Sequence, residues 1–88
     1  MEQQEPVFDE DMLLEMVDNQ LADGQPRQAK EALLRLSMTG HSQDEAKALI
    51  ACALGAEIMA MQASGQPFNM EQYLDNLAQL PAMPWADD

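Results

Sequence analysis

Four stretches of this 88-residue chain carry apolar residues at three- and four-residue spacings, the period of one face of an α-helix. Glycine or proline separates each stretch from the next, and both residue types end helices. The pattern therefore predicts an all-α fold, a small bundle of four helices with short loops and a long, central third helix. The predicted helices span residues 10–22, 27–38, 43–63 and 70–80.

Each predicted helix has an apolar side that we expect to form the core. On the third helix, two adjacent apolar stripes indicate two packing partners. The expected core side chains are Leu13, Met16, Val17, Leu21, Ala29, Ala32, Leu33, Leu36, Leu49, Ile50, Ala53, Leu54, Ala56, Ile58, Ala60, Met61, Met70, Tyr73, Leu74 and Leu77.

The first helix has a start signal directly before it. Asp9 can act as its N-cap, with Phe8 and Leu13 in the two positions of a hydrophobic staple. Gly24 and Pro26 end the helix, and Pro26 serves again as an early position of the second helix. Because only a few residues connect the two helices, we expect them to pack as an antiparallel hairpin.

The stretch from Gly40 to Ala46 contains the only histidine of the chain beside two acids, which would suit a metal site or a helix start. Ser42 and Glu45 stand three residues apart directly before an apolar run, the spacing of a capping box. His41 then falls just outside the helix, and we expect it to share no helical face with Asp44 or Glu45. The stretch is therefore interpreted as a helix start.

Three residues inside the third helix carry specific expectations. Gly55 costs about 1 kcal/mol relative to alanine in a helix interior, so its presence indicates close approach of a neighbouring helix. Glu57, the one acid in this part of the helix, is expected at a helix edge in solvent, and the alternative is a buried, functional carboxylate. Cys52 is the only cysteine, so no internal disulfide can form, and its apolar sequence neighbours indicate a buried thiol in a reducing compartment.

The fourth helix repeats the start signal of the third. Asn69 is the expected N-cap with Gln72 as its reciprocal partner, and Phe68 is expected to pack against Tyr73 as a staple. Pro81 ends the helix. The chain then divides into a disordered or extended N-terminus at residues 1–8, one helical domain at 9–81 and an acidic tail at 82–88.

Composition and charge narrow the function classes. Hydrophobic residues make up 47% of the chain, which is more than a disordered chain carries. With 16 acidic against 4 basic residues the formal net charge is -12, which repels nucleic-acid phosphates and anionic membranes. Three of the four bases, Arg27, Lys30 and Arg35, lie on the second helix, which we expect beside an acidic neighbour. The chain opens without a signal segment and no apolar run approaches a membrane span, so the expected localisation is cytoplasmic.

No residue pattern indicates catalysis: the chain lacks a phosphate-binding glycine loop, a Cys-x-x-Cys pair and a histidine close to Cys52 in sequence. Helix capping explains the clustered acids. We therefore expect a non-enzymatic protein without a cofactor, an interaction module that offers another protein an acidic surface and methionine-lined apolar grooves. The alternative interpretation of the methionines is core filler. The expected partner-binding residues are Met12, Met16, Met59, Met61 and Trp85.

A further set of positions is spread over the predicted helices: Asn19, Gln20, Leu21, Pro26, Leu36, Gly40, Glu45, Ala46, Ile50, Leu54, Gly55, Ile58, Gln62, Gly65, Pro67, Tyr73, Leu74 and Leu77. Over residues 14–80 this set resembles the C-terminal half of a family of small uncharacterised bacterial helical proteins, a domain of unknown function. Members of that family carry histidines at the positions of Leu14, Asp44 and Ala48 and an acid at that of Asp18. The resemblance implies a metal cluster on facing helices in those relatives.

The resemblance leaves two expectations for this chain. The histidines are missing here, so the alternative function is a weak metal-binding or metal-dependent protein with Asp18, His41, Asp44 and Glu45 as ligands. The relatives also have an additional N-terminal segment. If that segment covers the first or third helix, a second copy of this chain could bury the same surface in a two-fold homodimer.

Overall fold

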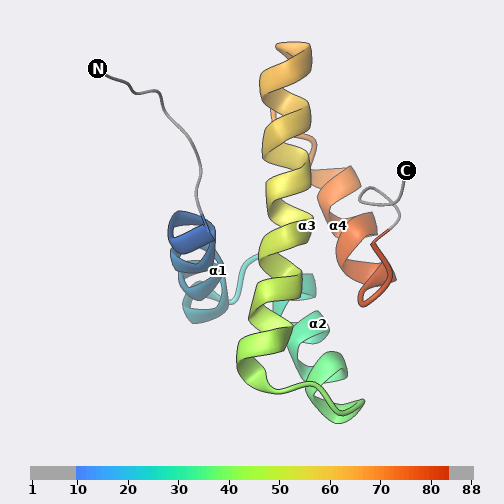
Figure 1. Ribbon diagram of the computed structural model, residues 1–88. Helices are drawn as coiled ribbons and strands as arrows, with labels where there is room; N and C mark the ends of the chain where they lie inside the picture. The colour runs from blue at the N-terminus through green and yellow to red at the C-terminus, as the bar shows by residue number, and fades with distance from the viewer. Residues whose placement is uncertain (1–9, 84–88) are drawn as a thin grey trace.

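The computed structural model describes residues 10–83, and over that range the protein consists of four α-helices without a strand (Figure 1). The expected all-α bundle is confirmed, and its third helix is the longest. Phe8 and Asp9, the expected staple and N-cap of the first helix, lie outside the described residues, as does Trp85. The helices are α1 (Glu10–Asp23), α2 (Arg27–Met38), α3 (Gln43–Ser64) and α4 (Met70–Gln79).

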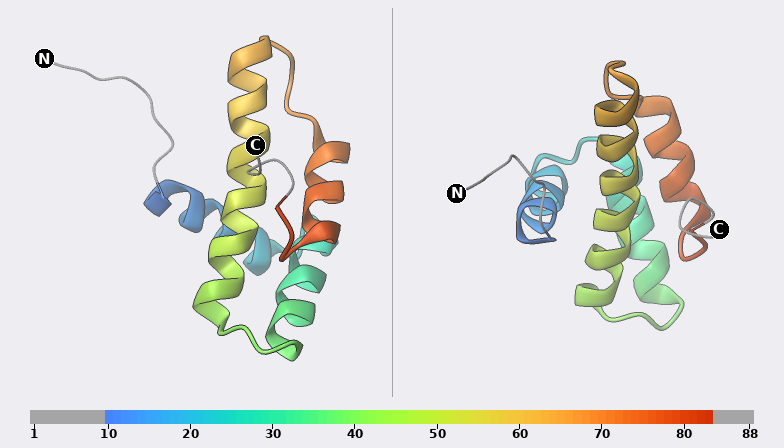
Figure 2. Two further views of the ribbon diagram at one scale, coloured as in Figure 1. Left: turned by 45° about the vertical axis from the view of Figure 1, so that its right-hand side comes forward. Right: turned by 45° about the horizontal axis from the view of Figure 1, so that its top comes forward.

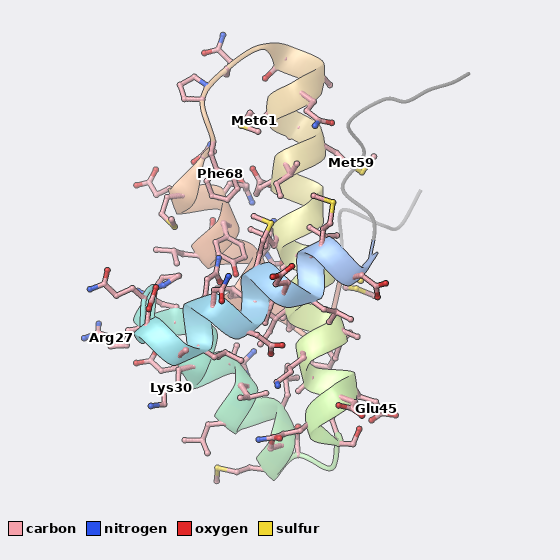
Figure 3. The ribbon with its side chains drawn as sticks, turned by 90° about the vertical axis from the view of Figure 1, so that its left-hand side faces the viewer. Arg27, Lys30, Glu45, Met59, Met61 and Phe68 are labelled. Atoms are coloured by element: carbon pink, nitrogen blue, oxygen red, sulfur yellow. The ribbon has the colours of Figure 1, made fainter. Side chains whose placement is uncertain are left out.

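Helix α3 lies at the centre of the bundle and packs against each of the other three helices. In Figures 1 and 2, α2 and α4 run antiparallel to α3, with α2 beside its N-terminal half and α4 further towards its C-terminal end. Helix α1 instead crosses α3 at a steep angle, as Figure 3 shows. The expected antiparallel hairpin of α1 and α2 is therefore wrong. The turn from Gly24 to Pro26 is short, but it does not fix the angle between the helices, and α1 packs mainly on α3.

The inner sides of the four helices form one core. Its largest fully buried side chains are Val17, Leu36, Ile50, Tyr73 and Leu77. Of the expected core residues, only Ala60 and Met70 are exposed, because both lie near the α3–α4 connection, beyond the tightly packed part of the core. The two apolar stripes expected on α3 serve three packing partners instead of two.

The start of α3 confirms the capping box. The Ser42 hydroxyl accepts a hydrogen bond from the Glu45 backbone N–H at 3.1 Å, and the Glu45 carboxylate accepts one from the Ser42 N–H at 3.2 Å. The helix ends at Gly65, whose φ of 73° lies in the left-handed region that favours glycine. The stretch around His41 is thus a helix start, as the sequence predicts.

The start of α4 confirms its N-cap and its staple. The Asn69 side chain accepts a hydrogen bond from the Gln72 backbone N–H at 3.1 Å. The rings of Phe68 and Tyr73 pack edge to face with centroids 5.8 Å apart. The reciprocal bond expected from Gln72 is wrong: its side-chain amide donates to Asn76 at 3.0 Å instead, because Asn76 is buried and needs a partner.

Gly55 marks the crossing of α1 over α3. A β-carbon at this position would lie 3.1 Å from Leu13 Cδ1, which is tighter than ordinary van der Waals contact. The expected close approach of a neighbouring helix is therefore confirmed, and that helix is α1. Glycine at this position lets the leucine side chain rest directly on the α3 backbone.

We expected the basic residues of α2 to lie beside an acidic neighbour, and this expectation is wrong. The Arg35 guanidinium donates hydrogen bonds to the backbone carbonyls of Leu77 at 3.0 Å and Leu80 at 2.8 Å, at the end of α4. Arg27 pairs with Glu31 on its own helix at 3.3 Å, where both side chains are exposed. Carbonyl groups at a helix C-terminus lack intrahelical donors and carry partial negative charge, so they attract a cation as an acid would.

Helix α3 also corrects the expectation that no apolar run approaches a membrane span. It has 22 residues and contains an 18-residue window with a mean hydropathy of 1.3, so by length and composition alone it could cross a bilayer. It is the one such helix between residues 10 and 83. The core helix of a bundle meets the same two criteria, and α3 packs against three helices, so this finding is weak evidence for a membrane span.

Candidate functional site

One side of α3 is apolar and exposed to solvent. Figure 1 shows α3 in front of α2, with α1 and α4 on either side and no described helix over its near side. Cys52 is exposed, Met59 is 70% exposed, and in Figure 3 Met59 and Glu45 project on the same side of α3, near opposite ends. We call this side the α3 outer face; it consists of Ala48, Leu49, Cys52, Ala56 and Met59.

Two grooves lie along the α3 outer face and meet at Cys52. The groove at the beginning of α3 has a volume of about 320 Å³, and His41 and Glu45 line it together with residues of the outer face. The groove at the crossing of α1 has a volume of about 410 Å³, and Leu13 and Met83 form its borders. Since Cys52 lines both grooves, they are neighbours along α3.

The structure places four of the five expected partner-binding residues, and their environments differ. Met59 lines the groove beside α1, whereas Met12 is 43% exposed outside the residues that line either groove. Met16 and Met61 are partly buried and pack against the core, which fits the core-filler interpretation. Trp85 lies outside the described residues.

Sequence reasoning missed most of the outer face. Cys52 was expected to be buried, and this is wrong because it lies on α3 directly opposite the buried stripe that contains Ile50 and Leu54. Ala56 was assigned to a packed stripe, and Met83 to the tail. The available signal was a second apolar repeat, at positions 48, 52, 56 and 59, on a helix whose opposite side already fills the core.

The four residues of the alternative metal site do not come together as one group. Asp18 pairs with Lys47, with Oδ1 and Nζ 2.9 Å apart, and Asp44 is exposed in the first turn of α3. Among residues 10–83, no group of three or more His, Cys, Asp or Glu side chains is placed to hold a metal ion. The arrangement of the described acids thus gives the metal hypothesis no geometric support.

His41 does contact an acid, contrary to the expectation that it shares no face with Glu45. The distance from His41 Nδ1 to Glu45 Oε1 is 3.6 Å. The reason is the capping box, because the Glu45 carboxylate folds back to the N-cap and so approaches the residue before it. Cys52 lines the same groove, two helical turns beyond Glu45 and about 10 Å further along the axis of α3.

Glu57 is buried, and the expectation that it lies in solvent is therefore wrong. Its side of α3 faces α4, where the Asn76 side-chain amide donates a hydrogen bond to Glu57 Oε2 at 3.2 Å. Asn76 accepts in turn from the Gln72 amide at 3.0 Å. Glu57 and Asn76 are 8% and 3% exposed, so this chain of hydrogen bonds links α3 to α4 inside the bundle.

A second polar contact ties α4 to α1. The Tyr73 hydroxyl donates a hydrogen bond to Gln20 Oε1 at 2.6 Å. Burial raises the pKa of Tyr73 to about 12. The phenol therefore remains neutral throughout the physiological range and acts as a fixed donor between the two helices.

Comparison with known proteins finds no matching family model, no matching curated protein and no matching solved structure. The resemblance to the bacterial helical family stays a prediction. The α3 outer face and its two grooves are consequently the features from which a function can be argued.

Proposed function

We propose that this protein is a non-enzymatic interaction module that binds an amphipathic helix of another protein along the α3 outer face. The observation that carries the proposal is an exposed apolar stripe on the central helix of a chain with a net charge of -12. Exposed apolar surface beside grooves is typical of binding sites for helices. Alanine at positions 48 and 56 would let a partner helix approach closely, while Met59 offers an adaptable contact.

Charge decides which partner fits best. Between Lys47 and the end of α3, the only charged residue is Glu57, and it faces inward, so the outer face itself is neutral. Its surroundings are acidic, with exposed Glu45 in one groove and exposed Asp11 on α1, two residues before the groove-lining Leu13. In Figure 3, Arg27 and Lys30 lie on the opposite side of the molecule. A partner helix with an apolar stripe and flanking lysines therefore complements the face better than a second copy of this acidic chain.

The experiment uses a synthetic amphipathic helix of about 20 residues with one alanine- and leucine-rich side and lysines beside it. Methyl-labelled methionine reports the site by NMR, because methionines lie both in the groove (Met59, Met83) and outside the lining of either groove (Met38). We expect saturable shifts of the Met59 and Met83 methyl signals without a shift of Met38. The same peptide with glutamates in place of the lysines should bind about tenfold more weakly or worse.

A matched pair of variants tests the location. Met59→Glu places a charge on the outer face and should weaken peptide binding about tenfold. Met38→Glu makes the same change at a residue that is 76% exposed and lines neither groove, and it should bind as wild type does. Equal binding by the two variants would overturn the proposal.

Sedimentation of the unliganded protein tests whether a second copy of this chain occupies the outer face instead of a partner helix. A dimer at micromolar concentration that Met59→Glu dissociates and Met38→Glu does not would show that a second copy occupies the face. A monomer that binds the lysine peptide supports the proposal, and a monomer that binds neither peptide contradicts it.

A further inference from the structure

A separate pocket lies where α3 ends and α4 begins. Its volume is about 180 Å³, and Glu57 lines it together with residues of the last two turns of α3 and of the following loop. Figure 3 shows Met61 on the side of α3 that faces this loop and Phe68. We call it the Glu57 pocket; it is distinct from the α3 outer face, which lies on another side of the same helix.

The Glu57 carboxylate is only half satisfied. Its Oε2 accepts from Asn76, and within the described chain no hydrogen bond or ion pair reaches Oε1. The side chain is more than nine-tenths buried and borders the pocket. Burying a carboxylate without a compensating cation or a full set of donors is unfavourable, which indicates that a positively charged group belongs beside Oε1.

The walls of the pocket suit the rest of such a ligand. Ala60, Met61 and Pro67 supply apolar surface on which an alkyl chain can lie. The side-chain oxygens of Ser64 and Asn69 at the rim each accept one backbone hydrogen bond, from Gln66 and Gln72, and have a second lone pair for a ligand.

Electrostatics of the helix end favour a cation at the same place. Ser64 is the last residue of α3, so the partial negative charge of this long helix lies at the pocket. The last turn of α3 contains no basic residue. The basic side chains in the described part of the chain do not line the pocket, and those of Arg27, Arg35 and Lys47 have partners elsewhere.

We propose that the Glu57 pocket binds an alkylammonium group, with the ammonium at Glu57 Oε1 and the alkyl chain against Ala60 and Met61. Ammonium fits better than guanidinium, because the fork of guanidinium binds both oxygens of a carboxylate and Asn76 already holds one of them. A volume of about 180 Å³ accommodates the end of a lysine side chain or a small free amine. The proposal does not depend on the α3 outer face.

The test titrates the protein with n-butylammonium chloride and follows the Met61 methyl and the Asn76 side-chain amide by NMR. Met61 lines the pocket and Asn76 contacts the same carboxylate, so both signals should shift saturably while Met59 and Met38 do not. The neutral analogue n-butanol should leave both signals in place, and n-butylguanidinium should bind more weakly. Shifts that spread without saturation over exposed acids would overturn the proposal.

Two variants and one control make the test decisive. Glu57→Gln keeps the size of the side chain and removes its charge, and it should lower the affinity at least about tenfold. Ala60→Leu leaves Glu57 intact and fills the pocket, so it should abolish the shifts even if Glu57→Gln does not fold. Glu71→Gln removes an exposed acid at the start of α4 and should bind as wild type. Equal affinity of Ala60→Leu and wild type would contradict the assignment of the site.

A third ligand, the peptide acetyl-Ala-Lys-Ala-amide, distinguishes a lysine side chain of a partner protein from a small free amine as the source of the ammonium group. Binding at least as tight as that of n-butylammonium assigns the pocket to a lysine side chain of a partner protein. Binding of n-butylammonium alone assigns it to a small free amine. Binding of neither compound, with n-butylguanidinium also inactive, rules out an organic cation site.

Discussion

The distribution of charged and apolar residues between the inner and outer sides of α3 is the reverse of that on an ordinary surface helix. The inner side packs Ile50 and Leu54 into the core, but it also holds the one charged residue between Lys47 and the end of the helix, Glu57. The outer side meets solvent with alanines, Cys52 and Met59. An ordinary amphipathic helix places its charges in water and its apolar residues inside.

This comparison shows which residues of α3 are needed for folding and which are not. The inner side is needed to join α3 to three other helices, and Glu57 takes part in a hydrogen-bonded link to α4. Leu49 of the outer side packs against the core, but Cys52 and Met59 are exposed, so a polar residue at position 52 or 59 would be compatible with the fold. Apolar residues at these positions fit the proposed binding of a partner helix, and substitutions on the two sides should have very different effects on stability.

The largest effect is expected from Ile50→Ala on the inner side. Ile50 is fully buried, and deleting most of its side chain leaves a cavity between α3 and its neighbours, so the free energy of unfolding should fall by about 3 kcal/mol. Urea denaturation followed by circular dichroism measures the change. Leu34→Ala, at a residue of α2 that is 62% exposed, should cost less than about 0.5 kcal/mol. Similar losses for both variants would show that the assignment of inner and outer residues is wrong.

A smaller effect is expected where α1 crosses the helix. Gly55→Leu forces a side chain into the space of Leu13, whose Cδ1 would lie 3.1 Å from the new β-carbon, and it should destabilise the fold by about 1–3 kcal/mol. Ala56→Leu introduces the same side chain one residue further along, where it can point into the groove, and should be close to neutral. The double variant with Leu13→Ala should recover part of the loss. No recovery would indicate that the strain lies elsewhere.

The helix starts and the close approach at Gly55 can be predicted from the sequence because their signals are local. Ser42 and Asn69 mark helix starts through hydrogen bonds to the backbone three residues later, and such spacing can be read directly. Gly55 could be read because a glycine inside a helix needs a reason, and the reason is Leu13.

The outer side and the Glu57 pocket escape prediction because they depend on how the helices are arranged. An alanine or a cysteine in an apolar run is compatible with either side of the helix until its neighbours are placed, so Cys52 was expected inside. Glu57 was expected outside because a lone carboxylate is rarely buried, and its partner Asn76 lies 19 residues further along the chain. The steep crossing of α1 likewise follows from packing on α3 and not from the length of the turn before α2.

A pH-dependent effect of intermediate size is expected from Tyr73. Its pKa is about 12 in the folded protein and about 10 in the unfolded chain. Below pH 10 the hydroxyl is therefore protonated in both states. As the pH rises from 10 towards 12, the unfolded state loses that proton and is favoured, and the free energy of unfolding should fall by up to about 2 kcal/mol. Tyr73→Phe should lack this decrease while losing about 1 kcal/mol at neutral pH with the hydrogen bond to Gln20. Parallel pH profiles of the two proteins would show that Tyr73 does not titrate as described.

The smallest effect is expected from Cys52→Ser on the outer side. Cys52 is exposed, so exchanging its sulfur for oxygen should change the free energy of unfolding by less than about 0.5 kcal/mol. For the same reason a thiol reagent should modify Cys52 in the folded protein without prior unfolding. If the thiol is instead protected and the substitution costs more than about 1 kcal/mol, the face is covered in the free protein, and the partner helix would have to displace that cover. Adding the lysine peptide should slow the modification in proportion to the fraction bound. This result would link the α3 outer face, where substitution has little effect on stability, to the proposed binding of a partner helix.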